Sequence, residues 1–409
     1  MEHQPLWTRN FTILTLGTVI SMLGNAISGF ALSLLILDYT GSTLLYAVFM
    51  VVYNLPKVIM PSIAGPYLDR FSRTKVIWVL DYLSAALYTL IFFLLNGGVF
   101  SYPLLLTLCF IIGTIDSVYL VAYDSLYPML ISEGNYAKAY SISSMLYPIS
   151  AIMVPVASWF YENVGLTPLF IFNAITFAIA ATFETQIRLD ESQVSKKHEA
   201  YTLSRYVDDF KQGIGYLKKE KGLMVITLYF VVSMMVGSGV GTLILPYFKS
   251  QENLGVFTYT WVMACSVFGR LIGGIVHYRF RYPMAKKFAI AFMVYIVSSL
   301  IEGTYLFMPV AAMMIVEFIS GLICVTSYNI RISSTQNYVP NDMRGRFNGT
   351  FQMLTTFGSI VGQLLAGLLG DLLPIRPVVV SMYAVCILAA VFIMYRGRKY
   401  VKPIYNVDI

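Results

Sequence analysis

Charge is scarce in this sequence. Of its 409 residues, only 12% are Asp, Glu, Lys or Arg, whereas a soluble globular domain carries roughly 25%. The three histidines, His3, His198 and His277, form no metal-like or catalytic cluster. The glycine-rich loop ending in Lys that holds nucleotide phosphates is absent as well. The scarcity of charge argues against a soluble protein, and the missing nucleotide loop argues against transport driven by ATP. We expect no enzyme activity, no cofactor and no resident metal.

Cysteine is also rare, and a cleavable leader is not expected. The four cysteines all lie inside apolar runs, which favours packing over disulfide or metal-ligand roles; they are Cys109, Cys265, Cys324 and Cys386. The first apolar run, at about 11–37, is too long for the core of a signal peptide and has no small-residue cleavage site behind it. We therefore expect it to be retained as a membrane span.

Long apolar runs are what the sequence does contain. Hydrophobic residues make up 57% of the chain, and its mean hydropathy is +0.70. A helical run of about 18 apolar residues is long enough to cross a hydrocarbon core of about 30 Å. We expect twelve spans, at 11–37, 44–64, 76–96, 103–127, 141–161, 166–183, 223–247, 255–276, 286–306, 310–333, 350–370 and 375–395. The sequence therefore predicts an all-α, multi-pass membrane protein.

Basic residues are distributed unevenly around these predicted spans. With the N-terminus in the cytoplasm, most of the 28 Lys and Arg residues fall in cytoplasmic segments, and only Lys249 and Arg376 fall in outer loops. Because membrane proteins keep basic residues on the cytoplasmic side, both termini are predicted to be cytoplasmic. The net charge of +7 then reflects basic residues beside anionic lipid and indicates no nucleic-acid partner.

The chain divides around one long hydrophilic stretch. Residues 184–222 carry mixed charge, and Val207, Phe210, Ile214 and Leu217 recur there at helical spacing, which predicts an amphipathic helix in a cytoplasmic linker. The predicted organisation is therefore an N-terminal six-helix bundle (1–183), the cytoplasmic linker (184–222), a C-terminal six-helix bundle (223–395) and a cytoplasmic tail (396–409).

The two predicted bundles look like repeats of each other. A shift of 208 residues aligns ILDY (36–39) with ILPY (244–247) and VPVAS (154–158) with GQLLA (362–366). The same shift pairs single residues, namely Gly65 with Gly273, Arg73 with Arg281, and Gly113 with Gly321. Parallel repeats of six spans are typical of transporters whose site lies between the halves.

The loop after the second predicted span carries a recognisable motif. Residues 65–75 read GPYLDRFSRTK, and this pattern resembles the signature loop of the major facilitator superfamily. The matching positions are Gly65, Asp69, Arg70, Arg73 and Lys75, and Ser72 replaces the usual glycine. The resemblance covers essentially the whole chain and implies twelve transmembrane helices in two pseudo-symmetric six-helix bundles.

One branch of that superfamily is more similar than the others. This branch is the drug:proton antiporters, which include macrolide-efflux and enterobactin-exporter relatives. Three segments support the resemblance: YPMLISEGNYAKA follows the fourth span, FKQGIGYLKKEKGL precedes the seventh, and YVPNDMRGRFNG follows the tenth. One departure is Ile112, which stands where many proton antiporters carry an arginine, and this puts their usual coupling scheme in doubt here.

The resemblance also implies a role for the loop as a conformational gate. Gly65 lets two helices approach closely, and Asp69 accepts hydrogen bonds at the start of helix 11. Arg70 and Arg73 are expected to pair with Asp124 on helix 4, which would hold the cytoplasmic side closed. The alternative is that these are ordinary basic residues in a tight cytoplasmic turn.

Ionisable residues inside the spans are the strongest site candidates, because each costs several kcal/mol unless it faces a cavity or a partner. Asp116 on helix 4 and Glu317 on helix 10 are predicted to line the transport path, and one or both to exchange protons. The alternative is static pairing, for example of Asp116 with Lys57. Other candidates for the substrate or proton pathway are Lys57, Asn25, Tyr119, Tyr328 and Arg331.

Four further positions have mainly structural interpretations. Asp81 is predicted to be structural, Arg270 to reach the inner surface, and Glu302 to reach the interface from a lipid-facing helix. In GSGVG, the GxxxG spacing of Gly237 and Gly241 predicts close helix packing.

These features favour an export antiporter in a bacterial cytoplasmic membrane. A hydrophobic or amphipathic organic compound, such as a drug, antibiotic or siderophore-like molecule, would leave in exchange for protons by alternating access, and the protein would work as a monomer. The 30 Tyr, 27 Phe and 20 Met suit an adaptable cavity for such a compound. The alternatives are uptake of a small metabolite with protons or sodium, or a sensor that keeps the fold without transport.

Overall fold

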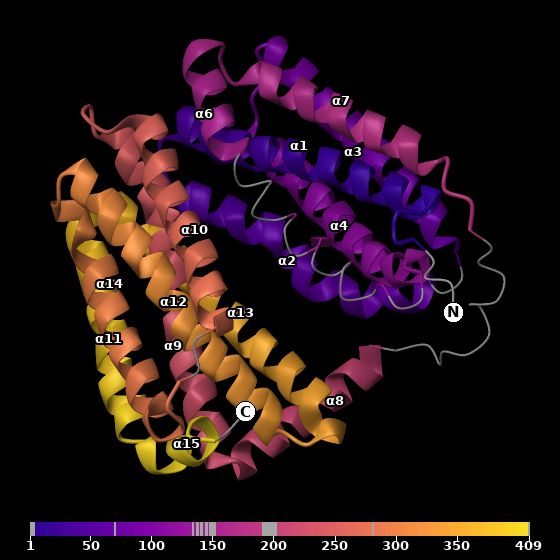
Figure 1. Cartoon of the computed structure of the whole chain (residues 1–409). Helices are drawn as coiled ribbons and strands as arrows, with labels where there is room; N and C mark the ends of the chain where they lie inside the picture. Colours follow the sequence, from indigo (N-terminus) through magenta and orange to yellow (C-terminus); the bar gives the residue numbers. More distant parts are fainter. Residues whose placement is uncertain are drawn as a thin grey trace. The chain divides into compact units, whose positions relative to one another are not determined.

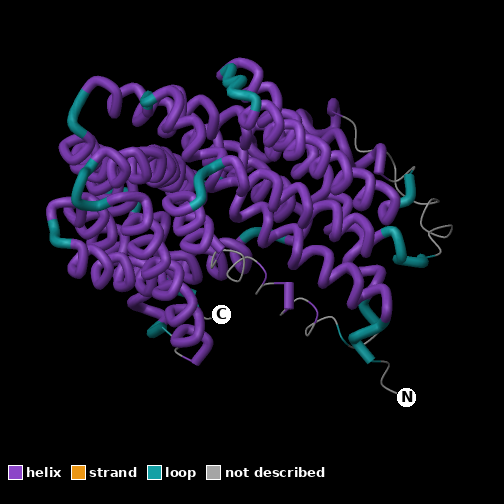
Figure 2. Tube along the Cα trace, turned by 90° about the horizontal axis from the view of Figure 1, so that it is seen from above, coloured by secondary structure: helices purple, strands orange, loops and turns teal. Residues whose placement is uncertain are grey.

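The computed structural model describes residues 5–68, 71–132, 153–189, 203–279 and 282–407, together with residues 135, 139, 142, 143 and 146. All regular elements in these ranges are helices, without a strand (Figure 2). They form two compact units, Met1–Gly41 with Phe49–Tyr206 and Ser42–Val48 with Val207–Ile409. The all-α fold predicted from the sequence is confirmed for this described part.

The helices of the first unit occupy the first half of the chain (Figure 1). They are α1 (Arg9–Thr40), α2 (Thr43–Leu68), α3 (Arg73–Asn96), α4 (Tyr102–Leu126), the 3-10 turn η1 (Tyr127–Leu130), α6 (Met153–Asn163) and α7 (Thr167–Glu184).

The second unit holds most of the remaining helices. They are α8 (Leu203–Lys219), α9 (Lys221–Ser250), α10 (Gly255–Arg279), η2 (Met284–Lys286), α11 (Lys287–Thr304), η3 (Tyr305–Phe307), α12 (Val310–Tyr338), α13 (Asn341–Leu372), α14 (Ile375–Ala389), the π-helical η4 (Ala390–Tyr395) and α15 (Arg398–Tyr405). Of these, α8 begins within the first unit and ends in the second.

Eleven helical segments of the described ranges are long and apolar enough to cross a membrane. They correspond to eleven of the twelve predicted spans. The remaining prediction, 141–161, falls largely outside the described residues, where only its end is seen as α6. Twelve spans and cytoplasmic termini therefore stay predictions.

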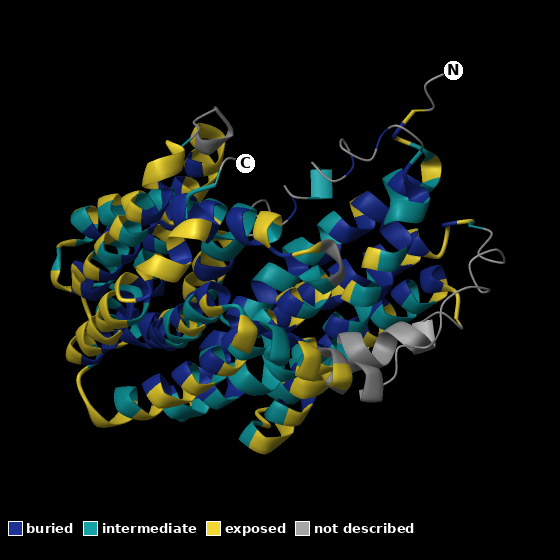
Figure 3. Cartoon of the chain, turned by 90° about the horizontal axis from the view of Figure 1, so that it is seen from below, coloured by how far each residue is buried: buried dark blue, intermediate teal, exposed yellow. Residues whose placement is uncertain are grey.

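Local sequence signals fix where these helices begin and end. The Thr8 side chain accepts a hydrogen bond from the Phe11 N–H at the start of α1, and Gly41 ends that helix at φ 62°, a conformation that suits glycine. Ser72 caps α3 by accepting from the Lys75 N–H. Buried side chains lie along the helix faces that meet within each unit (Figure 3). Many large apolar side chains are exposed, which suits hydrocarbon; examples are Phe93, Phe172, Ile275, Met293 and Phe357.

In the second unit, small residues bring α9 and α13 close together. A Cβ atom on Gly239 would lie 2.6 Å from the Gly362 carbonyl oxygen, so only glycine fits there. Gly237 and Gly241 have open space around their Cα atoms instead. The predicted packing role of Gly237 and Gly241 is therefore wrong, because the intervening glycine lies on the helix face that meets α13.

The start of α2 packs within the second unit. The carboxylate of Asp371, near the end of α13, accepts hydrogen bonds from the Thr43 N–H at 2.6 Å, the Leu44 N–H at 3.3 Å and the Ser42 hydroxyl at 2.6 Å. A negative charge is favourable at a helix N-terminus, where backbone N–H groups lack carbonyl partners. Residues 42–48 are thus anchored to α13, while the rest of α2 belongs to the first unit.

Two glycines that the 208-residue shift pairs make the same kind of contact. A Cβ atom on Gly113 of α4 would lie 2.2 Å from the Tyr53 carbonyl oxygen of α2. A Cβ atom on Gly321 of α12 would lie 2.1 Å from the Ser266 carbonyl oxygen of α10. In each unit, therefore, the helix that carries a candidate carboxylate meets its neighbour backbone to backbone.

Candidate functional site

In the first unit, Asp116 lies on α4 and faces α2. The Tyr53 hydroxyl donates to Asp116 Oδ2 at 2.7 Å. The close approach at Gly113 brings the two helices near enough for this bond, and the buried Ser117 hydroxyl donates to the Pro56 carbonyl oxygen at 3.3 Å. Tyr53 is a partner that sequence reasoning missed, because an aromatic residue in an apolar run gives no signal of its own.

Lys57 lies one turn after Tyr53 on α2. Its ammonium group is 4.6 Å from the centre of the Tyr53 ring and donates to Asn54 Oδ1 at 3.2 Å. Both Lys57 and Asp116 are described, and they form no ion pair with each other. Tyr53 thus stands between the cation and the carboxylate, and the pairing of Asp116 with Lys57 considered from the sequence is not seen.

A second group of polar side chains joins α3, α4 and α7. Asp81 and Glu184 are 1% and 0% exposed, and their carboxyl groups are hydrogen-bonded to each other. The Tyr119 hydroxyl donates to Glu184 Oε1 at 3.3 Å. Gly17 of α1 leaves room for this carboxyl group, because a Cβ atom there would lie 3.0 Å from the same oxygen. We refer to Asp81 and Glu184 as the first carboxyl pair.

The second unit contains a comparable group around Glu317 of α12. Glu317 is 4% exposed and hydrogen-bonded to Glu302 of α11 and to Ser266 of α10. The Ser320 hydroxyl donates to Glu302 Oε1. Glu302 therefore faces α12, so the predicted orientation of Glu302 toward lipid is wrong. We refer to Glu302 and Glu317 as the second carboxyl pair.

Arg270 of α10 is near enough to both members of the second carboxyl pair to interact with them electrostatically. Its guanidinium is exposed and makes no ion pair with a described carboxylate. The second carboxyl pair therefore has a cation nearby without being bonded to it.

Arg331 lies further along α12 among aromatic rings. Its guanidinium carbon is 4.8 Å from the centre of the Phe230 ring, 4.9 Å from that of Phe351 and 5.4 Å from that of Tyr328. Its Nε is buried without a hydrogen-bond partner among the described residues. The cation is thus held by ring faces rather than by a carboxylate.

Asn25 lies on α1 beside a small polar network. The Asn173 amide of α7 donates to the Ser28 hydroxyl at 2.7 Å, and that hydroxyl donates to the Asn25 backbone carbonyl oxygen. The Asn25 Oδ1 atom itself is buried without a partner among the described residues.

The predicted gate loop is only partly described. Asp69 and Arg70 lie outside the described residues, and Gly65 is within α2. Arg73 is the first residue of α3, is buried, and its Nη1 donates to Met129 Sδ at 3.1 Å. Asp124 is exposed on α4 and forms no ion pair with Arg73. The clasp between the loop and Asp124 stays a prediction.

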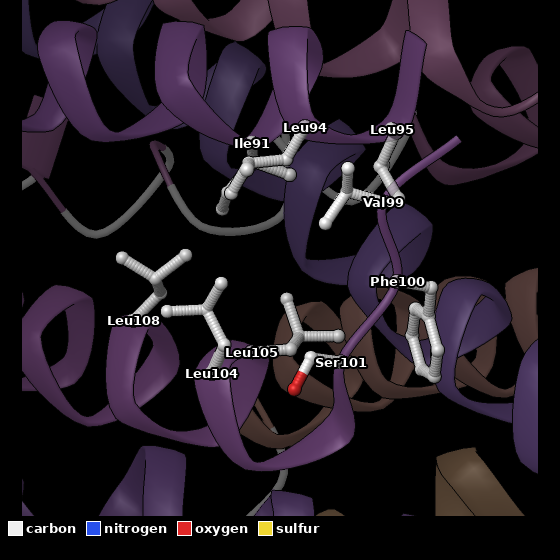
Figure 4. Close-up of a pocket in the computed structure, with 9 residues that line it drawn as sticks. All are labelled: Ile91, Leu94, Leu95, Val99, Phe100, Ser101, Leu104, Leu105 and Leu108. Carbon is white, nitrogen blue, oxygen red and sulfur yellow. The ribbon is translucent and has the colours of Figure 1, made fainter. Parts of the chain in front are cut away.

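The first unit also contains a small apolar hollow at the other end of α3 (Figure 4). It is lined by α3, α4 and the loop between them, through Ile91, Leu94, Leu95, Val99, Phe100, Ser101, Leu104, Leu105 and Leu108. Its volume is about 20 Å³. Pockets for organic ligands are roughly 300–1,000 Å³, so this hollow is too small for one. In the described part of the chain, side chains suited to a metal ion do not gather in groups of three, and the four cysteines are free.

Comparisons with known proteins agree with the arrangement of spans. The family model described as Major Facilitator Superfamily matches residues 14–335. An uncharacterized MFS-type transporter, YkuC of Bacillus subtilis (strain 168), is 26% identical over 279 residues, which are 66% of this chain and 64% of that relative. Macrolide efflux protein A of Streptococcus pyogenes is 22% identical over 387 residues, covering 91% of this chain and 92% of that one.

Solved structures show the same fold at low identity. A bacterial homologue of the iron transporter ferroportin, in an inward-facing state, is similar with a TM-score of 0.70 and 16% identity, over 97% of this chain and 100% of that chain. The nucleoside transporter NupG is similar with a TM-score of 0.70 and 15% identity, over 93% and 98%. The proteins that resemble this chain are thus multi-pass membrane transporters.

Proposed function

Because the chain belongs to the Major Facilitator Superfamily, we propose that it exports a hydrophobic or amphipathic organic compound in exchange for protons. It is a multi-pass transporter of a small molecule within a lipid bilayer. Beyond membership of the family, we propose that transport is outward and coupled to protons. We also propose that the protein is a monomer in a bacterial cytoplasmic membrane, with both termini in the cytoplasm.

The observation that carries this proposal is the burial of carboxyl groups in helices that are long enough to span a membrane. Glu317 is buried and Asp116 is half-buried in such helices, and neither forms an ion pair with a described Lys or Arg. A buried carboxyl group without a cation is stable only when hydrogen bonds or a proton offset its charge. Such groups suit a transporter that binds and releases protons.

The class of compound is supported by a relative and by the side chains available. Macrolide efflux protein A aligns with most of this chain, and its name indicates the efflux of macrolides. Within the second unit, the aromatic rings around Arg331 are side chains of the kind that contact such a molecule. In this proposal the substrate or proton pathway includes Asp116, Glu317, Lys57, Asn25, Tyr119, Tyr328 and Arg331.

The gate loop has a place in the same proposal. Gly65, Asp69, Arg70, Arg73 and Asp124 would close the cytoplasmic side in one state of the transport cycle and release it in the other. In the described residues, Arg73 is buried at the start of α3 and Asp124 is exposed on α4.

Everted membrane vesicles test the export antiporter directly. An inward-acid pH gradient would be imposed and followed with a fluorescent dye while macrolides, dyes, tetracyclines and siderophores are added. We expect at least one compound to dissipate the gradient with the unaltered protein, and the Asp116→Asn or Glu317→Gln variant to be silent. Asp208→Asn is the matched control, because this carboxylate on α8 is 60% exposed and lies outside the spans.

Each other outcome points to a different reading. If no compound moves protons while a labelled compound still crosses the membrane regardless of pH, proton coupling is wrong and a sodium-coupled or facilitative transporter replaces it. If labelled compounds accumulate only in the direction of uptake, the export direction is wrong. Absence of any transport would favour a sensor that keeps the fold.

A further inference from the structure

The first carboxyl pair is not among the residues assigned to the transport path, although Tyr119, which is, donates a hydrogen bond to Glu184. Asp81 is about two turns into α3, and Glu184 is the last residue of α7. Both side chains are enclosed almost completely, at 1% and 0% exposure. A charged carboxylate in such a place costs several kcal/mol unless partners offset it.

The partners of the pair are few. The Tyr119 hydroxyl donates to Glu184 Oε1, which leaves Glu184 Oε2 and Asp81 Oδ2 buried without an N–H or O–H donor among the described residues. The titratable groups that face the pair from α4 are Tyr119 and Asp116, and Asp116 is a further acid. Helix α1 contributes Gly17, whose lack of a side chain leaves room for the Glu184 carboxyl group. No described Lys or Arg acts on the pair.

The contact between the two carboxyl groups has a chemical requirement. Carboxylate oxygens only accept hydrogen bonds, so two carboxyl groups can bond each other only when one of them carries a proton. Two ionised carboxylates in contact would repel strongly in this apolar surrounding, and no Lys or Arg in the described ranges offsets them. A single shared proton removes the repulsion and supplies the missing donor.

We propose that Asp81 and Glu184 form a proton-binding site in which one proton is shared between their carboxyl groups and is exchanged during transport. Binding joins a proton to an oxygen of one carboxylate, and the other carboxylate accepts it as a hydrogen bond. Release leaves two carboxylates, which can separate only when water or a basic group reaches them. The site itself follows from the geometry, whereas its use in exchange rests on the proposed antiport.

The position of the pair suits that role. It joins the end of α7, where the chain continues toward residues 185–189, to α3 and α4, and α4 also carries Asp116. Asp116 acts electrostatically on Asp81, so the charge state of one alters that of the other. A proton at the pair is thereby linked to the candidate residue on the transport path without a direct bond.

Infrared spectroscopy of the full-length protein in lipid nanodiscs tests the site without any transported compound. The probe is the carbonyl stretch of protonated carboxyl groups, recorded at neutral pH and identified by its shift in D₂O. We expect the unaltered protein to show this band, and Asp81→Asn and Glu184→Gln each to remove the intensity of one carboxyl group. In each variant the new amide N–H donates to the remaining carboxylate, which no longer needs the proton. Asp208→Asn, at the exposed carboxylate, should leave the band unchanged.

The Tyr119→Phe variant controls for the possibility that the amide variants fail to fold. Tyr119→Phe removes only a hydroxyl group, keeps both carboxyl groups and should shift the band without abolishing it. The proposal is overturned if the unaltered protein lacks the band, if either amide variant retains it in full, or if Tyr119→Phe leaves its position unchanged. Because no substrate is added, a band that is lost as expected supports the site even if the antiport assay fails. Intact antiport without the band would instead refute the site alone.

Discussion

Each unit of the protein buries a pair of carboxyl groups, and the two pairs are stabilised differently. The first pair, Asp81 with Glu184, has one tyrosine hydroxyl and no described cation nearby. The second pair, Glu302 with Glu317, has serine hydroxyls from two helices and lies within the field of Arg270. By the same chemistry each pair needs a proton between its carboxyl groups, and the second pair has in addition serine hydroxyl groups and a nearby cation that stabilise its remaining negative charge.

The difference shows which parts of the two halves are equivalent. The repeat is maintained where backbones touch, at Gly113 and Gly321, and it is lost where acidic side chains meet. The first pair joins α3 to α7, whereas the second joins α11 to α12. The shared architecture thus supports different chemistry in each unit.

Substitution of the two equivalent glycines should have the largest effect on stability. In Gly113→Ala and Gly321→Ala the new methyl group would clash with a backbone carbonyl, so each should lower the free energy of unfolding by about 1–3 kcal/mol. Denaturation midpoints of the purified variants measure this loss. Gly237→Ala and Gly29→Ala, which have open space, should be neutral or stabilising. A large difference between Gly113→Ala and Gly321→Ala would end the claim of equivalent contacts.

Removal of tyrosine hydroxyl groups should distinguish a singly ionised carboxylate from a pair of carboxyl groups that spread one negative charge over both. Tyr53→Phe removes a 2.7 Å bond to Asp116, and we expect a loss of about 1.5–3 kcal/mol if that acceptor is ionised. Tyr119→Phe removes a 3.3 Å bond to a pair that shares a proton, so its loss should be about 0.5–1.5 kcal/mol. Chemical denaturation of both variants gives the comparison. Equal losses would contradict the difference in charge.

Ser320→Ala should weaken the second carboxyl pair alone. The hydroxyl that donates to Glu302 Oε1 disappears, and a typical loss is about 1 kcal/mol. Ser327→Ala on the same helix is the matched control, because its hydroxyl bonds only to the backbone carbonyl of Cys324. A shift in the melting midpoint for Ser320→Ala that does not exceed the shift for Ser327→Ala would show that this bond contributes nothing.

Arg270→Gln should have the smallest effect on stability and the most specific effect on protonation. Arg270 is exposed, so water screens its charge and its removal should barely change the melting midpoint. Without the cation, the second pair should hold its shared proton more tightly, so its contribution to the infrared band of protonated carboxyl groups should persist to higher pH. An unchanged spectrum would mean that the hydroxyl groups alone stabilise the second pair.

The spans could be predicted from the sequence because membrane thickness sets a minimum length of apolar helix. Eleven of the twelve predictions correspond to described helical segments, and the observed helices generally extend a few residues beyond the predicted cores. Asp116 and Glu317 could be singled out for the same reason, since an acid in an apolar run has few tolerable surroundings. Their roles stay predictions.

The partners of these acids could not be predicted in the same way. Glu184 stands at the boundary of an apolar run and was assigned to the linker, although it continues a buried stripe at helical spacing with Asn173, Phe177 and Ala180. Glu302 was given the wrong face because the orientation of a mostly apolar helix depends on its neighbours. Gly239 was missed for the same reason, since the GxxxG spacing identifies residues on one face without showing which face is packed.

The contact of Asp371 with the start of α2 also affects the exchange of backbone hydrogens with solvent. First-turn amides of a helix have no carbonyl partner and normally exchange quickly. Here the carboxylate of Asp371 occupies the N–H groups of Thr43 and Leu44. Deuterium uptake at these two amides would therefore report how often the start of α2 separates from α13. The Asp371 contact thus makes hydrogen exchange a measure of local opening at the start of α2.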